Sequence, residues 1–122
     1  MKKRYRVKRN EEFQSIIKKG QRIVSHNFIV YYDTARMIRN DRVGISVGKK
    51  LGNAVERNRI KRQVRMMADE IVKADRGLDT IIIVRKDYPE STFEAHKKEL
   101  LKVYESVYNS IVDELKGEEH EK

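Results

Sequence analysis

Thr80 to Val84 form a continuous β-branched run, in which one threonine is followed by four apolar residues. A strand with one face in water alternates apolar and polar residues, whereas a continuous run is typical of a strand buried on both faces. The run follows a predicted strand, Val43 to Val47, and a predicted helix that begins after Asn53 and continues to about Ala74. This order predicts a βαβ unit whose second strand is buried on both faces.

Further helices and strands are predicted around this unit. Asn10 suits a helix N-cap, so residues 11–19 are expected to form a first helix. Residues 22–25 and 28–32 have strand character, and we expect the second of these to form a hairpin with Val43 to Val47. The element order is then αββ before the βαβ unit.

A last helix follows Pro89, where Ser91 and Glu94 form a capping box. Apolar residues continue at helical spacing to about Leu115, and residues 113–122 are expected to be an acidic, frayed tail. The full order, αβββαβα, predicts an α+β fold, a two-layer sandwich with helices packed on a small mixed sheet. A chain of 122 residues is long enough for one core, so we expect a single domain over residues 1–122.

The segment Phe28 to Tyr32 carries apolar residues on both of its faces. Phe28, Val30 and Tyr32 point one way in an extended chain, and the two intervening residues point the other way. One set can pack in the core while Ile29 and Tyr31 line a groove. Phe13, Ile17 and Tyr31 can be read as core residues or as groups that stack on exposed bases.

The segment Arg57 to Arg65 concentrates five cations in nine residues without interrupting a helical apolar pattern. Its polar side spans an arc of roughly 140° on a helical wheel, opposite the side that carries Ile60 and Val64. Solvated helices usually mix charges at i,i+4, but no carboxylate lies between Glu56 and Asp69. Arginine can donate two hydrogen bonds to one phosphate, so an RNA-binding helix is favoured over a merely solvated face.

The charge of the whole chain favours a polyanionic partner. The formal net charge is +9, and no apolar run approaches the roughly 20 residues of a membrane-spanning helix. The chain has no cysteine, which excludes disulfides and thiol catalysis and makes a reducing cytoplasm the default location. The charge therefore predicts RNA, DNA or an acidic membrane surface as the partner, and the membrane is the least expected of the three.

Self-contained catalysis is not predicted. Carboxylates are scattered, without the cluster that two-metal phosphodiester chemistry requires, and His26, His96 and His120 are expected on the surface. The glycines before Lys49 and Lys50 lack P-loop spacing, so an NTPase is rejected. The two lysines precede a helix, where they either bind a phosphate or are simply exposed.

The sequence Gly48-Lys49-Lys50-Leu51-Gly52-Asn53-Ala54-Val55, continuing into Arg57-Asn58-Arg59 and the following cations, resembles the bacterial ribonuclease P protein family. The resemblance extends from the first helix to Arg85. It implies a left-handed βαβ crossover, an exception to the usual handedness. It also implies that a large RNA subunit, with Mg²⁺ bound mainly by that RNA, removes the 5′ leader of precursor tRNA while the protein assists.

The resemblance further implies two sets of site residues and no catalytic or metal-binding residue in the protein. The catalytic RNA would contact Arg57, Asn58, Arg59, Lys61, Arg62 and Arg65. The single-stranded leader would contact Phe13, Ile17, Ile29, Tyr31, Lys49, Lys50, Arg85 and Lys86. Ile17 stands where related proteins often have a second Phe, so base stacking at that point would be lost.

The implied partners are the catalytic RNA and precursor tRNA, with no organic cofactor and no obligate protein partner. A structural, ribosomal-type RNA-binding protein would explain the charge and fold equally well, but not the whole signature. An autonomous nuclease is a third alternative, and the missing carboxylate cluster argues against it.

Overall fold

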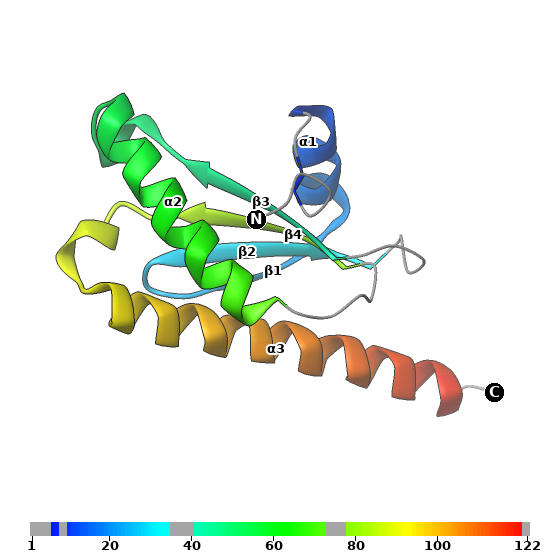
Figure 1. Cartoon of the computed structure of the whole chain (residues 1–122). Coiled ribbons are helices and arrows are strands. Elements are labelled where there is room, and N and C mark those ends of the chain that lie inside the picture. The colour runs from blue at the N-terminus through cyan, green and yellow to red at the C-terminus, as the bar shows by residue number, and fades with distance from the viewer. Residues whose placement is uncertain (1–5, 8–9, 35–40, 73–77, 121–122) are drawn as a thin grey trace.

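The computed structural model describes residues 6–7, 10–34, 41–72 and 78–120, with the backbone alone for residues 90 and 113–120. These residues form three helices, four strands and two short 3₁₀ turns (Figure 1). The elements are α1 Asn10–Lys19, β1 Gln21–Val24, β2 Phe28–Asp33, β3 Arg42–Val47, η2 Lys49–Leu51, α2 Ala54–Ile71, β4 Asp79–Val84, η3 Tyr88–Glu90 and α3 Phe93–His120. This order confirms the predicted α+β sequence of elements.

The four strands form one mixed sheet in the order β1-β2-β4-β3. Strand β4 pairs antiparallel with β2 and parallel with β3, so the predicted βαβ unit of β3, α2 and β4 is confirmed. The predicted hairpin between β2 and β3 is wrong, because β4 lies between them. The hairpin instead joins β1 to β2, where Ser25 N donates to Phe28 O at 2.8 Å.

Strands β2 and β4 distribute their side chains as the sequence predicts. Phe28 and Val30 are fully buried and Tyr32 is buried, whereas Ile29 and Tyr31 are half-buried. In β4, Ile82 belongs to the main core and Ile81 to a second, smaller cluster. The β4 strand is therefore buried on both faces of the sheet.

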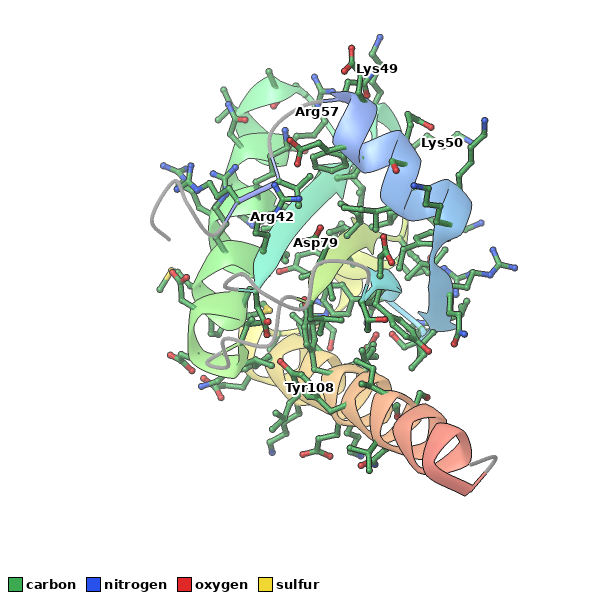
Figure 2. All side chains as sticks on the ribbon, turned by 90° about the vertical axis from the view of Figure 1, so that its right-hand side faces the viewer. Arg42, Lys49, Lys50, Arg57, Asp79 and Tyr108 are labelled. Atoms are coloured by element: carbon green, nitrogen blue, oxygen red, sulfur yellow. The ribbon has the colours of Figure 1, made fainter. Side chains whose placement is uncertain are left out.

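Helices α2 and α3 cover one face of the sheet and α1 covers part of the other (Figure 2). The main core under α2 and α3 contains Val64, Met67, Leu100 and Tyr104, all fully buried. Each such side chain contributes about 1.5–3 kcal/mol through burial of apolar surface. Among the described residues, the ten-residue α1 and Val7 pack on the second face, where Phe13, Tyr31 and Ile83 stay half-buried.

Two predicted helix boundaries differ in the structure. Helix α2 ends at Ile71, because Val72 is extended (φ −92°, ψ 96°), rather than continuing to Ala74. Helix α3 continues to His120, past the predicted end at Leu115, and includes most of the segment expected to be frayed. No glycine or proline lies between Leu115 and Gly117, and the helix also continues through Gly117.

The start of α3 corrects two other predictions. Thr92, not Ser91, caps the helix, with its Oγ1 accepting from Ala95 N at 3.2 Å. His96 is 1% exposed rather than on the surface, because it stacks on the Tyr88 ring with centroids 3.9 Å apart. Its Nε2 also bonds Tyr88 O at 2.7 Å, so η3 supplies a partner that linear spacing does not reveal.

Gly44 on β3 allows α1 to pack closely on the sheet. A Cβ at this position would lie 2.6 Å from Phe13 Cζ and 2.7 Å from Ile81 Cδ1. We therefore expect Gly44→Ala to lower the free energy of unfolding by about 1–3 kcal/mol through overpacking. Thermal or urea denaturation measures the change.

Gly48→Ala is the matched control, because a Cβ there meets nothing within 4 Å. It should leave the stability unchanged within about 0.5 kcal/mol. Equal stabilities for the two variants would show that Phe13 does not pack against β3 in solution.

Candidate RNA-binding surfaces

One candidate surface is the partly covered sheet face that carries α1, named the α1 groove after the groove that the sequence predicts there. Phe13, Tyr31 and Ile83 are half-buried there against a small cluster of Val7, Ile16 and Ile81. Ile29 pairs across the strands with Ile83, and Tyr31 with Ile81, so these side chains share one face. Ile17 is also half-buried on α1. The structure thus brings the apolar residues predicted for the groove to one side of the sheet.

Four exposed cations gather at one end of this sheet. Val47 and Val84, the last residues of β3 and β4, are register partners, so the segments that follow both strands leave the sheet together. Those segments carry Lys49 and Lys50 on one side and Arg85 and Lys86 on the other. Arg85 is held in place by donating from Nη1 to Ser25 O at 2.8 Å.

Arg22 is a groove residue that the sequence analysis missed. It lies opposite Tyr31 in the β1–β2 pairing, with Arg22 Nη1 3.5 Å from the Tyr31 hydroxyl. The side chain is exposed and adds a cation at the β1 side of the groove. The short turn of three residues between β1 and β2 could have predicted that Arg22 faces Tyr31, because a short hairpin fixes which residues pair across its strands.

Two carboxylates on the α1 face, Asp79 and Glu12, are paired with Arg42. Arg42 donates two hydrogen bonds to the Asp79 carboxylate, from Nε at 3.0 Å and from Nη2 at 2.9 Å. Its Nη1 also contacts Glu12 of α1 at 2.6 Å. Hydrogen bonding to Asp79 raises the pKa of Arg42. The cluster ties α1 to the sheet and offsets the negative charge on that face.

The second candidate surface is the basic side of α2. Asn53 caps the helix as predicted, accepting at Oδ1 from Glu56 N at 3.0 Å. Arg57, Lys61 and Arg65 are half-buried along one flank of α2. Asn58 and Arg62 are exposed beside them. A shallow hollow is bordered by Val55, Asn58, Lys61, Arg62 and Arg65. Five of the six residues predicted to bind the catalytic RNA therefore form one surface.

Positive charges lie close together on this surface. Burial, and next the nearby charge of Arg6, lower the pKa of Arg65. Arg6 is held there because its segment runs along β3, with Val7 N donating to Val43 O at 3.1 Å. Arg57 Nε is buried and has no acceptor among the described residues. A bound phosphate would offset the neighbouring charges of Arg6 and Arg65 and would accept a hydrogen bond from Arg57 Nε.

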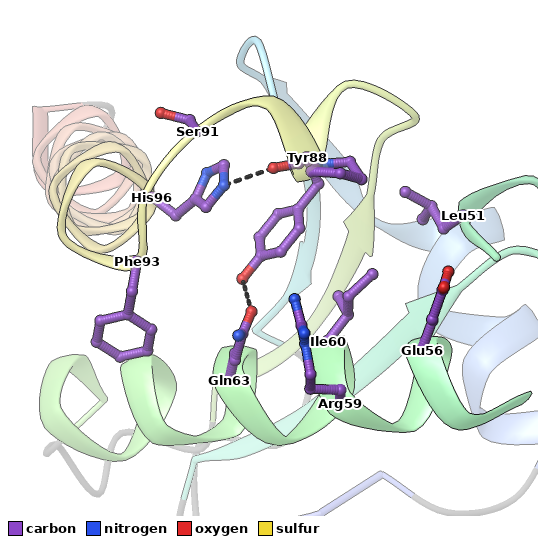
Figure 3. Close-up of a pocket in the computed structure, with 10 residues that line it drawn as sticks. Leu51, Glu56, Arg59, Ile60, Gln63, Tyr88, Ser91, Phe93 and His96 are labelled. Atoms are coloured by element: carbon purple, nitrogen blue, oxygen red, sulfur yellow. Dashed lines mark hydrogen bonds between the residues drawn. The ribbon is translucent and has the colours of Figure 1, made fainter. Parts of the chain in front are cut away.

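Arg59 does not lie with the other five residues. On the helix it falls opposite Arg57 and Arg65, and it borders a separate cleft with Gln63 and Tyr88 (Figure 3). Consecutive residues on a helix are separated by about 100°, so a contiguous motif is divided between two flanks.

The described residues contain no group of three histidine or acidic side chains placed to hold a metal ion. None of the described helices combines the length and the apolar content that a membrane crossing requires. The two candidate surfaces present ring and aliphatic groups, amides and cations.

Comparison with known proteins agrees with this geometry. The family model described as Ribonuclease P matches residues 1–108. The chain is 46% identical over 105 residues to the ribonuclease P protein component of Bacillus cereus (strain G9842), covering 85% of this chain and 91% of that protein. The chain belongs to the ribonuclease P protein family.

Solved structures of the family have the same fold. The Staphylococcus aureus ribonuclease P protein superposes with a TM-score of 0.77 at 38% identity, covering 84% of this chain and 94% of that one. The Thermotoga maritima ribonuclease P protein gives a TM-score of 0.69 at 27% identity, covering 80% and 92%. The family match confirms the predicted family, and the shared structure confirms the predicted α+β fold.

Ribonuclease P proteins act as cofactors of a catalytic RNA in processing the 5′ leader of tRNA. This confirms the predicted endoribonuclease function, and it implies association with that RNA and with the tRNA substrate. The family model ends at residue 108, so the last part of α3 lies beyond the matched region.

The charge on α2 generates a salt-dependent prediction. Arg65→Ala should weaken binding to a bacterial ribonuclease P RNA and reduce the slope of log affinity against log salt by roughly one, because one phosphate contact is lost. Lys98→Ala removes an exposed cation from α3 and serves as the control, with no expected change in slope. A slope unchanged by Arg65→Ala would place this residue outside the RNA interface.

Proposed function

We propose that this chain uses opposite sides of its sheet for the two RNAs of a ribonuclease P. The basic surface of α2, formed by Arg57, Asn58, Lys61, Arg62 and Arg65, docks onto the catalytic RNA, and Arg59 contributes from the other flank. The α1 groove holds the single-stranded 5′ leader of precursor tRNA. The observation that carries the proposal is that α1 and α2 cover different faces of the sheet (Figure 2).

Half-buried rings in the α1 groove suit an unpaired leader. Phe13 and Tyr31 keep part of their ring surface exposed beside Ile29 and Ile17. A base stacked on an aromatic side chain gains about 1–3 kcal/mol, with little dependence on which base it is. Ile17 offers apolar contact but no ring, so we expect it to contribute less than a phenylalanine there.

Cations at the end of the groove would follow the leader backbone. Lys49, Lys50, Arg85 and Lys86 are exposed at that end of the sheet, and Arg22 adds a charge beside Tyr31. Only the precursor has a leader, so this groove strengthens binding of the precursor relative to mature tRNA. Holding the leader also keeps the scissile bond in register with the catalytic RNA.

Catalysis in this proposal belongs to the RNA, which also holds most of the Mg²⁺. The protein supplies no acid, base or organic cofactor, and its cations lower the repulsion between the phosphates of two assembled RNAs. The cytoplasm is the proposed location. No membrane and no obligate protein partner are required.

A cleavage assay separates this proposal from a purely structural RNA-binding role. Adding the chain to a bacterial ribonuclease P RNA at low Mg²⁺ should increase cleavage of precursor tRNA at the mature 5′ end. The chain without RNA should give no cleavage, whereas an autonomous nuclease would cleave. Failure to stimulate the RNA would eliminate the processing role.

Tyr31→Ala should reduce the affinity of the assembled enzyme for precursor tRNA by roughly five- to one-hundredfold, corresponding to about 1–3 kcal/mol for one stacked base. The loss should shrink as the leader is shortened, because the base that stacks is then removed. Tyr31→Phe keeps the ring and is the matched control. A loss that is the same for every leader length would make Tyr31 a core residue.

A further inference from the structure

A cleft lies between α2, η3 and the beginning of α3, away from the α1 groove (Figure 3). It has a volume of about 280 Å³. Leu51 and Ile60 form apolar parts of its wall, and Tyr88, Pro89 and Phe93 add flat surfaces. The polar lining residues are Glu56, Arg59, Gln63, Ser91 and His96.

One wall of the cleft is fixed by several contacts to Tyr88. Its ring stacks on His96 with an interplanar angle of 9°, and its hydroxyl donates to Gln63 Oε1 at 2.9 Å. Burial raises the pKa of Tyr88 to about 12, so the hydroxyl remains a donor at neutral pH. The cleft is therefore preorganised rather than dependent on a ligand for its shape.

The hydrogen bond from Tyr88 also orients the Gln63 amide. Its oxygen is occupied, while its NH₂ group has no partner among the described residues. Ser91 and Arg59 are exposed at the rim of the cleft, and Phe93 is half-buried. A planar ligand can thus meet a ring, two hydrogen-bonding side chains and a cation within one cleft.

We propose that this cleft receives one unstacked base of the catalytic RNA, with the phosphate of that nucleotide at Arg59. The base would lie against Phe93 and bond to Gln63. The inference deepens the proposed function, because it rests on the catalytic RNA docking onto α2.

The position of Arg59 favours RNA as the occupant. The α2 helix with its side chains is about 10–12 Å wide, so an RNA strand over Arg62 reaches both flanks of the helix. Arg59 stands on the flank that borders the cleft, next to the rings. Unpaired bases are typically recognised by this combination of an aromatic surface, an amide and a guanidinium.

The absence of cysteine allows a direct proximity test with the full chain assembled on a bacterial ribonuclease P RNA. Ser91→Cys carries a unique thiol at the cleft rim, to which an iron–EDTA group can be attached. Hydroxyl radicals from this group should cleave a short segment of the RNA that contains an unpaired base. Glu105→Cys, exposed on α3, should give no comparable cleavage.

Asn58→Cys on the basic surface distinguishes the two ways in which the inference can fail. RNA cleavage from Asn58→Cys without cleavage from Ser91→Cys would mean that the RNA docks on α2 but leaves the cleft to another ligand, such as a protein side chain. No cleavage from either position would overturn both this inference and the proposed docking of α2.

Phe93→Leu tests the stacking itself, because it keeps an apolar side chain against the core but removes the ring. We expect about tenfold weaker binding to the RNA, with an unchanged melting temperature, and loss of chemical protection at one base near the Ser91→Cys cleavage site. Gln63→Met should expose the same base, and it provides a second variant if Phe93→Leu fails to fold. Unchanged affinity and protection in the folded variant would overturn the inference.

Discussion

Burial of β4 on both of its faces is the constraint on which the rest of this fold depends. A strand without a polar face needs cover on each side and hydrogen-bonding partners on each edge. Strands β2 and β3 supply the two edges, while α2 with α3 and the shorter α1 supply the cover. Because α1 spans only ten residues, its face stays partly open. The α1 groove is a consequence of this unequal cover.

Charge is distributed differently on the two faces of the sheet. On the α1 face, Arg42 draws Asp79 and Glu12 into one cluster, and exposed cations lie at the other end of the strands. The charge of Arg6, in the segment beside β3, lies near Arg65 of α2. Like charges held near each other destabilise the free protein, and a polyanion removes this cost on binding. Assembly with RNA and the stability of the protein are therefore linked.

Local patterns predicted much of this structure, and contacts distant in sequence account for most of the errors. The Asn53 cap, the alternation in β2 and the burial of β4 each follow from neighbouring residues. The β2–β3 hairpin was wrong because β4, which separates these strands, comes later in the chain. His96 was misplaced because its partner Tyr88 belongs to a 3₁₀ turn without a periodic signal. Arg59 is separated from its neighbours because it borders a cleft formed with Tyr88, which is distant in sequence.

The central claim is that the two faces bind different RNAs independently, and a double-mutant cycle with Arg65→Ala and Tyr31→Ala tests it most directly. Protein–RNA affinity is measured first, and then the ratio of precursor to mature tRNA affinity at saturating protein. Arg65→Ala should change only the first quantity and Tyr31→Ala only the second, with additivity within about 0.5 kcal/mol. Strong coupling, or a change in tRNA discrimination from Arg65→Ala, would contradict the division of labour between the two faces.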